Sequence, residues 1–150
     1  MAKYKSGKHN KIAIGILFAL VAVLAIGLIT ALFRVDTQIQ TETLTKYSYE
    51  VGALSETDEG KELTSDGSIR TKDFHSVDGL TITLKKDAKV TYKIFCFDKD
   101  GEFLSAVSSV SDLPEGADTF RLVVTPTEDA EISSLDIGDY SGQLTVTFNK

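Results

Sequence analysis

An uninterrupted apolar run, IAIGILFALVAVLAIGLITALF, occupies residues 12–33 and constrains the chain more than any other feature. Its 22 residues carry no charge. A helix of that length, at about 1.5 Å per residue, spans a hydrocarbon core of roughly 30 Å, so we expect a transmembrane helix here. Residues 1–11 contain four lysines and no acid, and the positive-inside tendency therefore places this tail in the cytoplasm and the rest of the chain outside the cell.

A basic start followed by an apolar run also fits a cleaved secretory signal. The run is longer than the roughly 7 to 15 residues of a signal-peptide core, which favours a retained signal anchor. We expect a single-pass protein of the cell membrane with two further parts beyond the helix. Residues 34–45 (RVDTQIQTETLT) form a polar stalk, and residues 46–150 form an extracellular domain.

The expected outer part of the chain is strongly acidic. Residues 35–150 contain all 22 Asp and Glu against 11 Lys and Arg, which gives a formal charge of −11. Nucleic acids and anionic lipid headgroups both attract basic surfaces. The charge therefore argues against either as a partner of the domain and leaves lipid contact to residues 12–33.

A period of two in the apolar residues dominates the second half of the chain. LTITLK at 80–85 and QLTVTF at 143–148 alternate apolar with polar residues, which predicts strands with one buried and one solvated face. Turn-forming Gly, Asp and Ser clusters separate further expected strands at 47–54, 68–72, 89–97, 102–107, 119–125 and 131–137. About eight strands without a convincing amphipathic helix predict an all-β antiparallel sandwich.

The tetrad Asp98-Lys99-Asp100-Gly101 lies between two of these strands. Asp at the first position and Gly at the fourth favour a type I turn that closes through a left-handed residue. A helix-flanked calcium loop would instead need Gly at its sixth position and Glu at its twelfth. We therefore interpret the tetrad as the turn of a hairpin.

The strand before this turn has two apolar faces. Tyr92, Ile94 and Cys96 share the parity of an inward face, where a thiol behaves as a small apolar group. Phe95 and Phe97 then point to the opposite side. Either a loop buries them, which is the favoured interpretation, or they form an exposed patch for a ligand or partner.

Arg121 poses a similar question in the strand TFRLVV. It alternates with Phe120 and Leu122 and so should point away from the core. There it pairs with an acid across the sheet, the favoured alternative, or meets a polar ligand.

Catalytic residues are not recognisable, and we expect no enzyme. The only histidines are His9 and His75, and one imidazole with a buried thiol makes neither a triad nor a zinc site. No cofactor is expected. Two sets of acids in loops are candidates for a structural calcium ion: Glu56, Asp58 and Glu59, and Asp136 with Asp139. The favoured interpretation of both sets is that of solvated turns.

Several stretches together resemble a known class of module. They are VGALSETDEGKELTSDGSIRTKDF, GLTITL, VTYKIFCFDKDGEFLSA and LPEGADTFRLVVTPTED. The succession resembles the jelly-roll β-sandwich modules, galactose-binding-like or carbohydrate-binding-like, of bacterial surface and phage tail proteins, over about residues 47–148. The resemblance implies a bacterial protein and non-catalytic binding, often of glycans, in which aromatic side chains stack on sugar rings.

This chain has no Trp, so other side chains would have to bind the ligand. The candidates are Phe95, Phe97, Tyr49, Tyr140 and Arg121. The alternative function is that of a structural or accessory subunit of a membrane or cell-surface complex. A glycan binder should present an aromatic platform rimmed by polar groups, and an accessory subunit a broad apolar patch.

Overall fold

The computed structural model describes residues 39–150, which form one compact unit. The basic tail 1–11, the expected transmembrane helix 12–33 and the start of the expected stalk lie outside the described residues. Within residues 39–150, no helix has the length and apolar character needed to cross a membrane.

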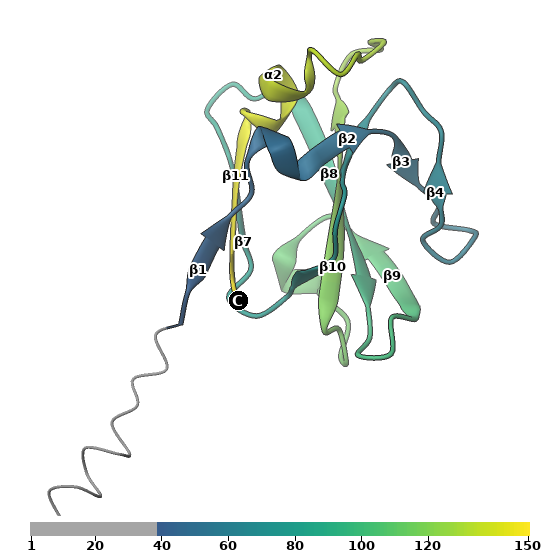
Figure 1. The fold of residues 1–150 in the computed structure, drawn as a ribbon, viewed down its shortest axis with the longest axis vertical. Coiled ribbons are helices and arrows are strands. Elements are labelled where there is room, and N and C mark those ends of the chain that lie inside the picture. Colours follow the sequence, from purple (N-terminus) through teal and green to yellow (C-terminus); the bar gives the residue numbers. More distant parts are fainter. Residues whose placement is uncertain (1–38) are drawn as a thin grey trace, which may run out of the picture. The chain divides into compact units, whose positions relative to one another are not determined.

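Two antiparallel sheets build the described domain (Figure 1). The first has the order β1-β11-β7, from β1 (Thr41–Thr43), β11 (Leu144–Asn149) and β7 (Thr81–Leu84). The second has the order β2-β5-β10-β8-β9, and β6 (His75–Ser76) also pairs with β10. Its strands are β2 (Tyr49–Val51), β5 (Ile69–Thr71), β10 (Thr119–Pro126), β8 (Val90–Phe97) and β9 (Phe103–Val107).

The remaining elements are short. The strands β3 (Ala53–Leu54) and β4 (Glu62–Leu63) pair with each other in a separate hairpin. One α-helix, α2 (Ile137–Ser141), and two 3-10 helices, η1 (Lys46–Ser48) and η2 (Val110–Asp112), complete the domain. The predicted all-β antiparallel sandwich is confirmed, with eleven strands among residues 39–150 in place of about eight, and its layers are compatible with a jelly roll.

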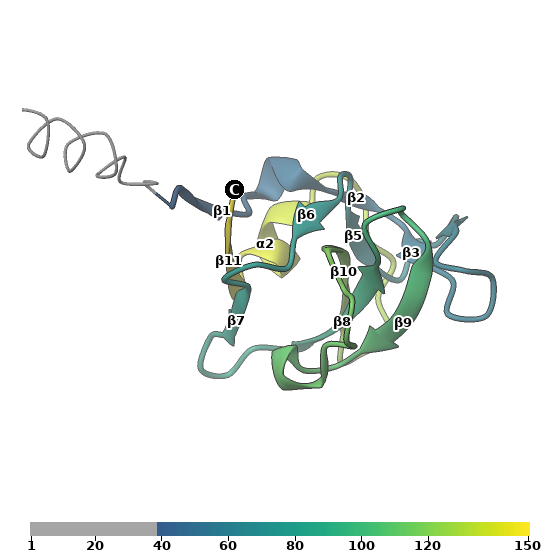
Figure 2. The ribbon, with the colours of Figure 1, turned by 90° about the horizontal axis from the view of Figure 1, so that it is seen from below.

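The main core lies between the two sheets. Figure 2 shows β1, β11 and β7 on one side and β5, β10, β8 and β9 on the other. Alternate residues of each strand point into this space, including Ile94 and Cys96 of β8, Phe120 of β10 and Val146 of β11. The predicted inward face of β8 and the structural role of Cys96 are therefore confirmed.

A second, smaller cluster lies on the outer face of the larger sheet. Phe95, Phe97 and Val123 are buried there beneath Leu54 of β3. This accounts for the continuous burial at the end of β8, where successive side chains on both faces are covered. The favoured interpretation, that a loop buries Phe95 and Phe97, is confirmed.

The hairpin turn is also confirmed. The amide of Gly101 donates to the carbonyl of Asp98 at 3.0 Å, and Gly101 has a φ of 81°. The Asp98 carboxylate accepts from the amides of Asp100 and Glu102, both at 2.9 Å. The acid that first resembles a metal ligand thus closes the turn, as Asp side chains do at this position.

Three expectations about secondary structure are wrong. The segment 131–137 is not a strand, because its single buried apolar residue, Ile132, is anchored from a loop and Ser133 and Asp136 form a local turn. The stretch 47–54 is interrupted at Gly52, whose φ of 149° breaks the strand. The domain also begins before residue 46, since Thr41–Thr43, expected in the stalk, pairs with β11.

Candidate binding site on the outer face of the larger sheet

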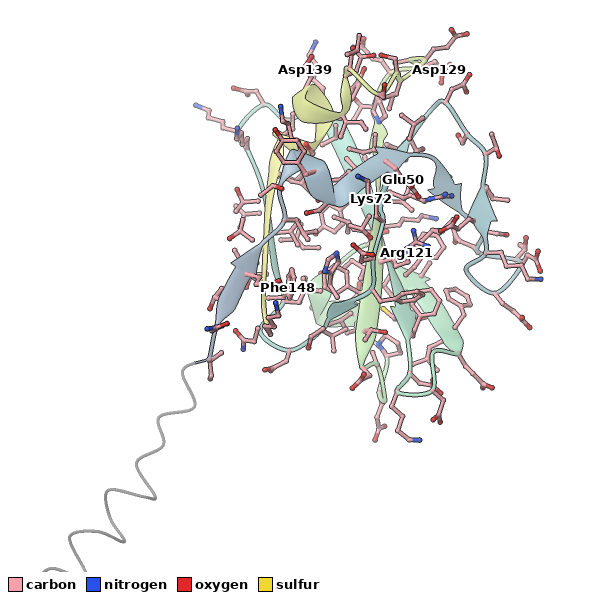
Figure 3. All side chains as sticks on the ribbon, in the orientation of Figure 1. Glu50, Lys72, Arg121, Asp129, Asp139 and Phe148 are labelled. Atoms are coloured by element: carbon pink, nitrogen blue, oxygen red, sulfur yellow. The ribbon has the colours of Figure 1, made fainter. Side chains whose placement is uncertain are left out.

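Four charged side chains meet on the outer face of the larger sheet. Glu50 on β2 and Arg70 on β5 are directly paired in register, and Arg121 points to the same face from β10. Glu62 reaches this face from β4 of the separate hairpin. We call these four residues the Arg–Glu network; Figure 3 shows Glu50 and Arg121 within it.

Glu62 bridges the two arginines. Its Oε1 accepts from Nη1 of Arg121 and its Oε2 accepts from Nη2 of Arg70, both at 2.8 Å. Glu50 accepts from Nε of Arg70 at 2.8 Å. Two carboxylates thus neutralise two guanidinium groups, and hydrogen bonding from Arg121 lowers the pKa of Glu62.

Backbone carbonyls accept from further arginine donors. Nη1 of Arg70 donates to Ala53 and Leu63, at 2.9 and 3.1 Å. Nε of Arg121 donates to the carbonyl of Thr71 at 3.1 Å. Both arginines are buried, a condition that is costly for a charge unless its partners are in place. The favoured prediction for Arg121, pairing with an acid, is confirmed.

Phe74 lies beside this network and is open to solvent. It belongs to the loop between β5 and β6 and is 52% exposed. Its ring centroid lies 5.6 Å from Cζ of Arg121 and 4.8 Å from the centroid of Phe97, at an interplanar angle of 79°. The Glu62 side chain, itself 54% exposed, binds the same guanidinium. An accessible aromatic ring is therefore held next to an accessible carboxylate.

The structure does not gather the predicted site residues on one surface. Phe95 and Phe97 are 2% and 4% exposed, and Tyr49 is buried in the main core, where burial raises the pKa of its hydroxyl. Tyr140 packs against the same core from α2. Arg121 and Phe97 do lie close to Phe74. A ligand-binding role for the five stays a prediction, but the buried side chains present almost no surface in this arrangement.

Four contributors to the site were missed from the sequence: Glu50, Glu62, Arg70 and Phe74. Glu62 and Arg121 are separated by 59 positions, and nothing in the local pattern indicates that they meet. The signal for Phe74 was its place as a lone aromatic in the polar loop RTKDFHS. Such a ring, with no apolar neighbours at strand spacing, is a candidate for exposure.

Three of the five acids considered for calcium bind protein neighbours. Asp58 pairs with Lys61 at 2.8 Å, Glu56 pairs with Lys93, and Asp136 accepts from Ser133. Among residues 39–150, no three His, Cys, Asp or Glu side chains are arranged to hold a metal ion.

His75 is half-buried on β6. Its ring packs against those of Phe120 and Phe148, with centroid distances of 5.7 and 4.9 Å. Its Nε2 is buried without a hydrogen-bond partner, and burial lowers the pKa of the imidazole. His75 thus packs at the margin of the main core in this arrangement.

No protein-family model, curated protein or solved structure matches the chain.

Proposed function

We propose that this protein is a non-catalytic binding module, held at the outside of a cell membrane by residues 12–33, and that Phe74 is the centre of a site for a glycan or another cell-surface polymer. One observation carries the proposal. Phe74 is a half-exposed ring fixed against Arg121 and bordered by the accessible carboxylate of Glu62. This is the platform with a polar rim that a sugar-binding surface requires.

The chemistry of the network suits a neutral, hydroxyl-rich ligand. A sugar ring offers an apolar face that stacks on an aromatic side chain, while its hydroxyls donate to carboxylate oxygens. Glu50 and Glu62 are balanced by Arg70 and Arg121, so the site carries little net charge. Most of the guanidinium donors are directed to protein acceptors, which leaves the carboxylates as the main polar contacts for a ligand.

The same network supports binding over hydrolysis. A glycosidase needs one carboxyl group that stays protonated near neutral pH, which requires a raised pKa. Hydrogen bonding to Arg121 lowers the pKa of Glu62, so this carboxyl is ionised and is a poor general acid.

A glycan array probed with the full-length chain in nanodiscs tests the proposal. We expect binding to at least one glycan, and loss of that binding in Phe74→Ala. Tyr47→Ala is the matched control, because Tyr47 is 75% exposed but contacts Lys46 outside the network. Binding that survives Phe74→Ala, or an array without signal, would contradict the assignment.

The second candidate function is that of an accessory subunit in a membrane complex. It is supported by two exposed leucines on strands at the ends of the sheets, Leu84 on β7 and Leu104 on β9. Apolar side chains on an open sheet edge favour contact with another protein chain. Crosslinking in intact membranes would distinguish this function: a reproducible partner together with a silent glycan array favours the accessory subunit.

A further inference from the structure

Residues 53–63 form a strap across the outer face of the larger sheet. Its two strands, β3 and β4, pair with each other and, among the described residues, with no strand of either sheet (Figure 1). The strap is therefore attached to the sandwich by side chains and by contacts to its backbone.

The strap covers a row of aromatic rings. Phe97 lies 5.7 Å from Phe103, and Phe95 lies 6.0 Å from Phe103, centroid to centroid. Gly60 of the strap sits directly against this row, because a Cβ at that position would be 2.8 Å from Cζ of Phe97. Removing the strap would expose these rings without disturbing the core between the sheets.

Both apolar and polar groups attach the strap. Leu54 is the only strap side chain in the buried aromatic cluster. Gly60 adds its backbone contact with the rings. The polar contacts are the bonds of Glu62 to Arg70 and Arg121, the Glu56–Lys93 pair and the two backbone carbonyls that accept from Arg70. Glu56 and Lys93 are both half-exposed, so this pair contributes roughly 0 to 1 kcal/mol. Opening the strap also returns Glu62 and the two guanidinium groups to water, which offsets much of the loss of their ion pairs, so we expect the strap to be held less firmly than the core.

The two groups that the strap places on the sheet are directly opposite each other. Leu54 and Glu62 are register partners in the hairpin, so their Cβ atoms are about 5 Å apart. Leu54 lies on the aromatic rings while the Glu62 carboxylate lies across the two guanidinium groups. The strap thereby shows which chemistry this face accepts: an apolar group with a carboxylate a few ångströms away.

We propose that the strap is a built-in competitor for a second binding site, and that this site takes an apolar carboxylate. When the strap lifts, Phe95 and Phe97 receive the apolar group, and Arg70 and Arg121 receive the carboxylate. The sandwich stays folded, because its main core lies on the other face of the sheet. This site goes beyond the glycan platform and does not depend on it, since Phe74 is accessible with the strap closed.

Amide exchange of the full-length chain in nanodiscs tests the opening. The reporters are strap amides with hydrogen bonds inside the strap, those of Ser55, Gly60 and Lys61, compared with the amides of β10. We expect strap amides to exchange at least tenfold faster than those of β10, and about tenfold faster again in Glu62→Gln, which loses the bridging charge. Glu59→Gln is the matched control, because Glu59 is an exposed strap acid without an ion pair among the described residues. Strap and β10 amides that exchange together in all three proteins would overturn the proposal.

Ligand binding is tested with two small probes that share a phenyl ring and a three-carbon chain and end in a carboxylate or in a neutral hydroxyl group. The probes are 3-phenylpropanoate and 3-phenylpropan-1-ol, and binding to the same full-length chain is followed by saturation-transfer NMR. We expect the acid to bind and the alcohol not to bind. We expect Glu62→Gln to bind the acid about tenfold more tightly, because the guanidinium groups of Arg70 and Arg121 lose their competing carboxylate. Equal binding of acid and alcohol, or no gain in Glu62→Gln, would refute the site. Neither result bears on the glycan array, so the two proposals fail separately.

Discussion

The contact between Gly60 and the aromatic row makes a quantitative prediction about substitution by alanine. Gly60 has a φ of 73°, and a Cβ there would lie 2.8 and 2.9 Å from two atoms of the Phe97 ring. Gly101 has a similar φ of 81° but nothing within 4 Å of such a Cβ. The left-handed conformation costs an alanine about 1 kcal/mol at either position. Gly101→Ala therefore isolates the backbone cost, and Gly60→Ala adds the steric cost.

The steric cost follows from the confinement of Phe97. Its ring is 4% exposed and is held between Phe74 and Phe103, so it cannot swing away freely. Overpacking of this kind costs about 1 to 2 kcal/mol at the lower end of its usual range. We expect Gly60→Ala to lower the free energy of unfolding by about 2 to 3 kcal/mol, against about 1 kcal/mol for Gly101→Ala.

Urea unfolding of residues 39–150, followed by far-UV circular dichroism, measures both values; this part of the chain is a compact unit with its own core. At equal denaturant slopes, the difference between the two midpoints reports the steric cost alone. A Gly60→Ala variant no less stable than Gly101→Ala would refute the reasoning. It would mean that the strap does not rest on the Phe97 ring.

Two further predictions concern buried titratable groups. Burial lowers the pKa of His75 below 6.5, so as the pH falls the unfolded chain binds a proton at this imidazole before the folded chain does. The contribution of the neutral His75 to stability is therefore complete above pH 6.5 and is lost as the pH falls through the lower folded-state pKa. Urea midpoints measured as the pH is lowered from above 6.5 should fall, and His75→Leu should reduce this dependence of the midpoint on pH. Burial raises the pKa of Cys96 to about 11, so an aromatic disulfide reagent should leave it unmodified at pH 8, in contrast to the urea-unfolded chain. Rapid modification of the folded protein would contradict the buried position.

Periodicity was sufficient to predict most of the sandwich. Strands expected at 80–85, 89–97, 102–107, 119–125 and 143–148 correspond to β7, β8, β9, β10 and β11. Alternation identifies a strand when several residues in succession face a core, and these five strands are long enough to show it. The two-residue strands β4 and β6 present no period, and α2 is a single turn in a stretch that contains β-branched residues.

The site was predictable only in part, because parity assigns a side chain to a face but not to a partner. The outward direction of Arg121, and the need of Phe95 and Phe97 for a cover, both follow from alternation in one strand. The identity of that cover depends on how the hairpin at 53–63 folds back over the sheet. Local sequence does not specify that path, and so nothing in the sequence singles out Glu62.

The outer face of the larger sheet combines two kinds of group that require different covers. Aromatic rings are buried well by apolar atoms, whereas guanidinium groups need carboxylates or carbonyls. If the cover were permanent, apolar side chains on both the strap and the sheet would serve equally well. Replacing a buried ion pair with packed hydrophobic residues is often neutral or stabilising. The strap instead places one leucine and one bridging glutamate on this face. An attachment that depends on ion pairs with the partly solvated Glu62 weakens with protonation of Glu62, while the apolar core between the sheets does not. The ionic character of the attachment is therefore an argument for a cover that is displaced in function.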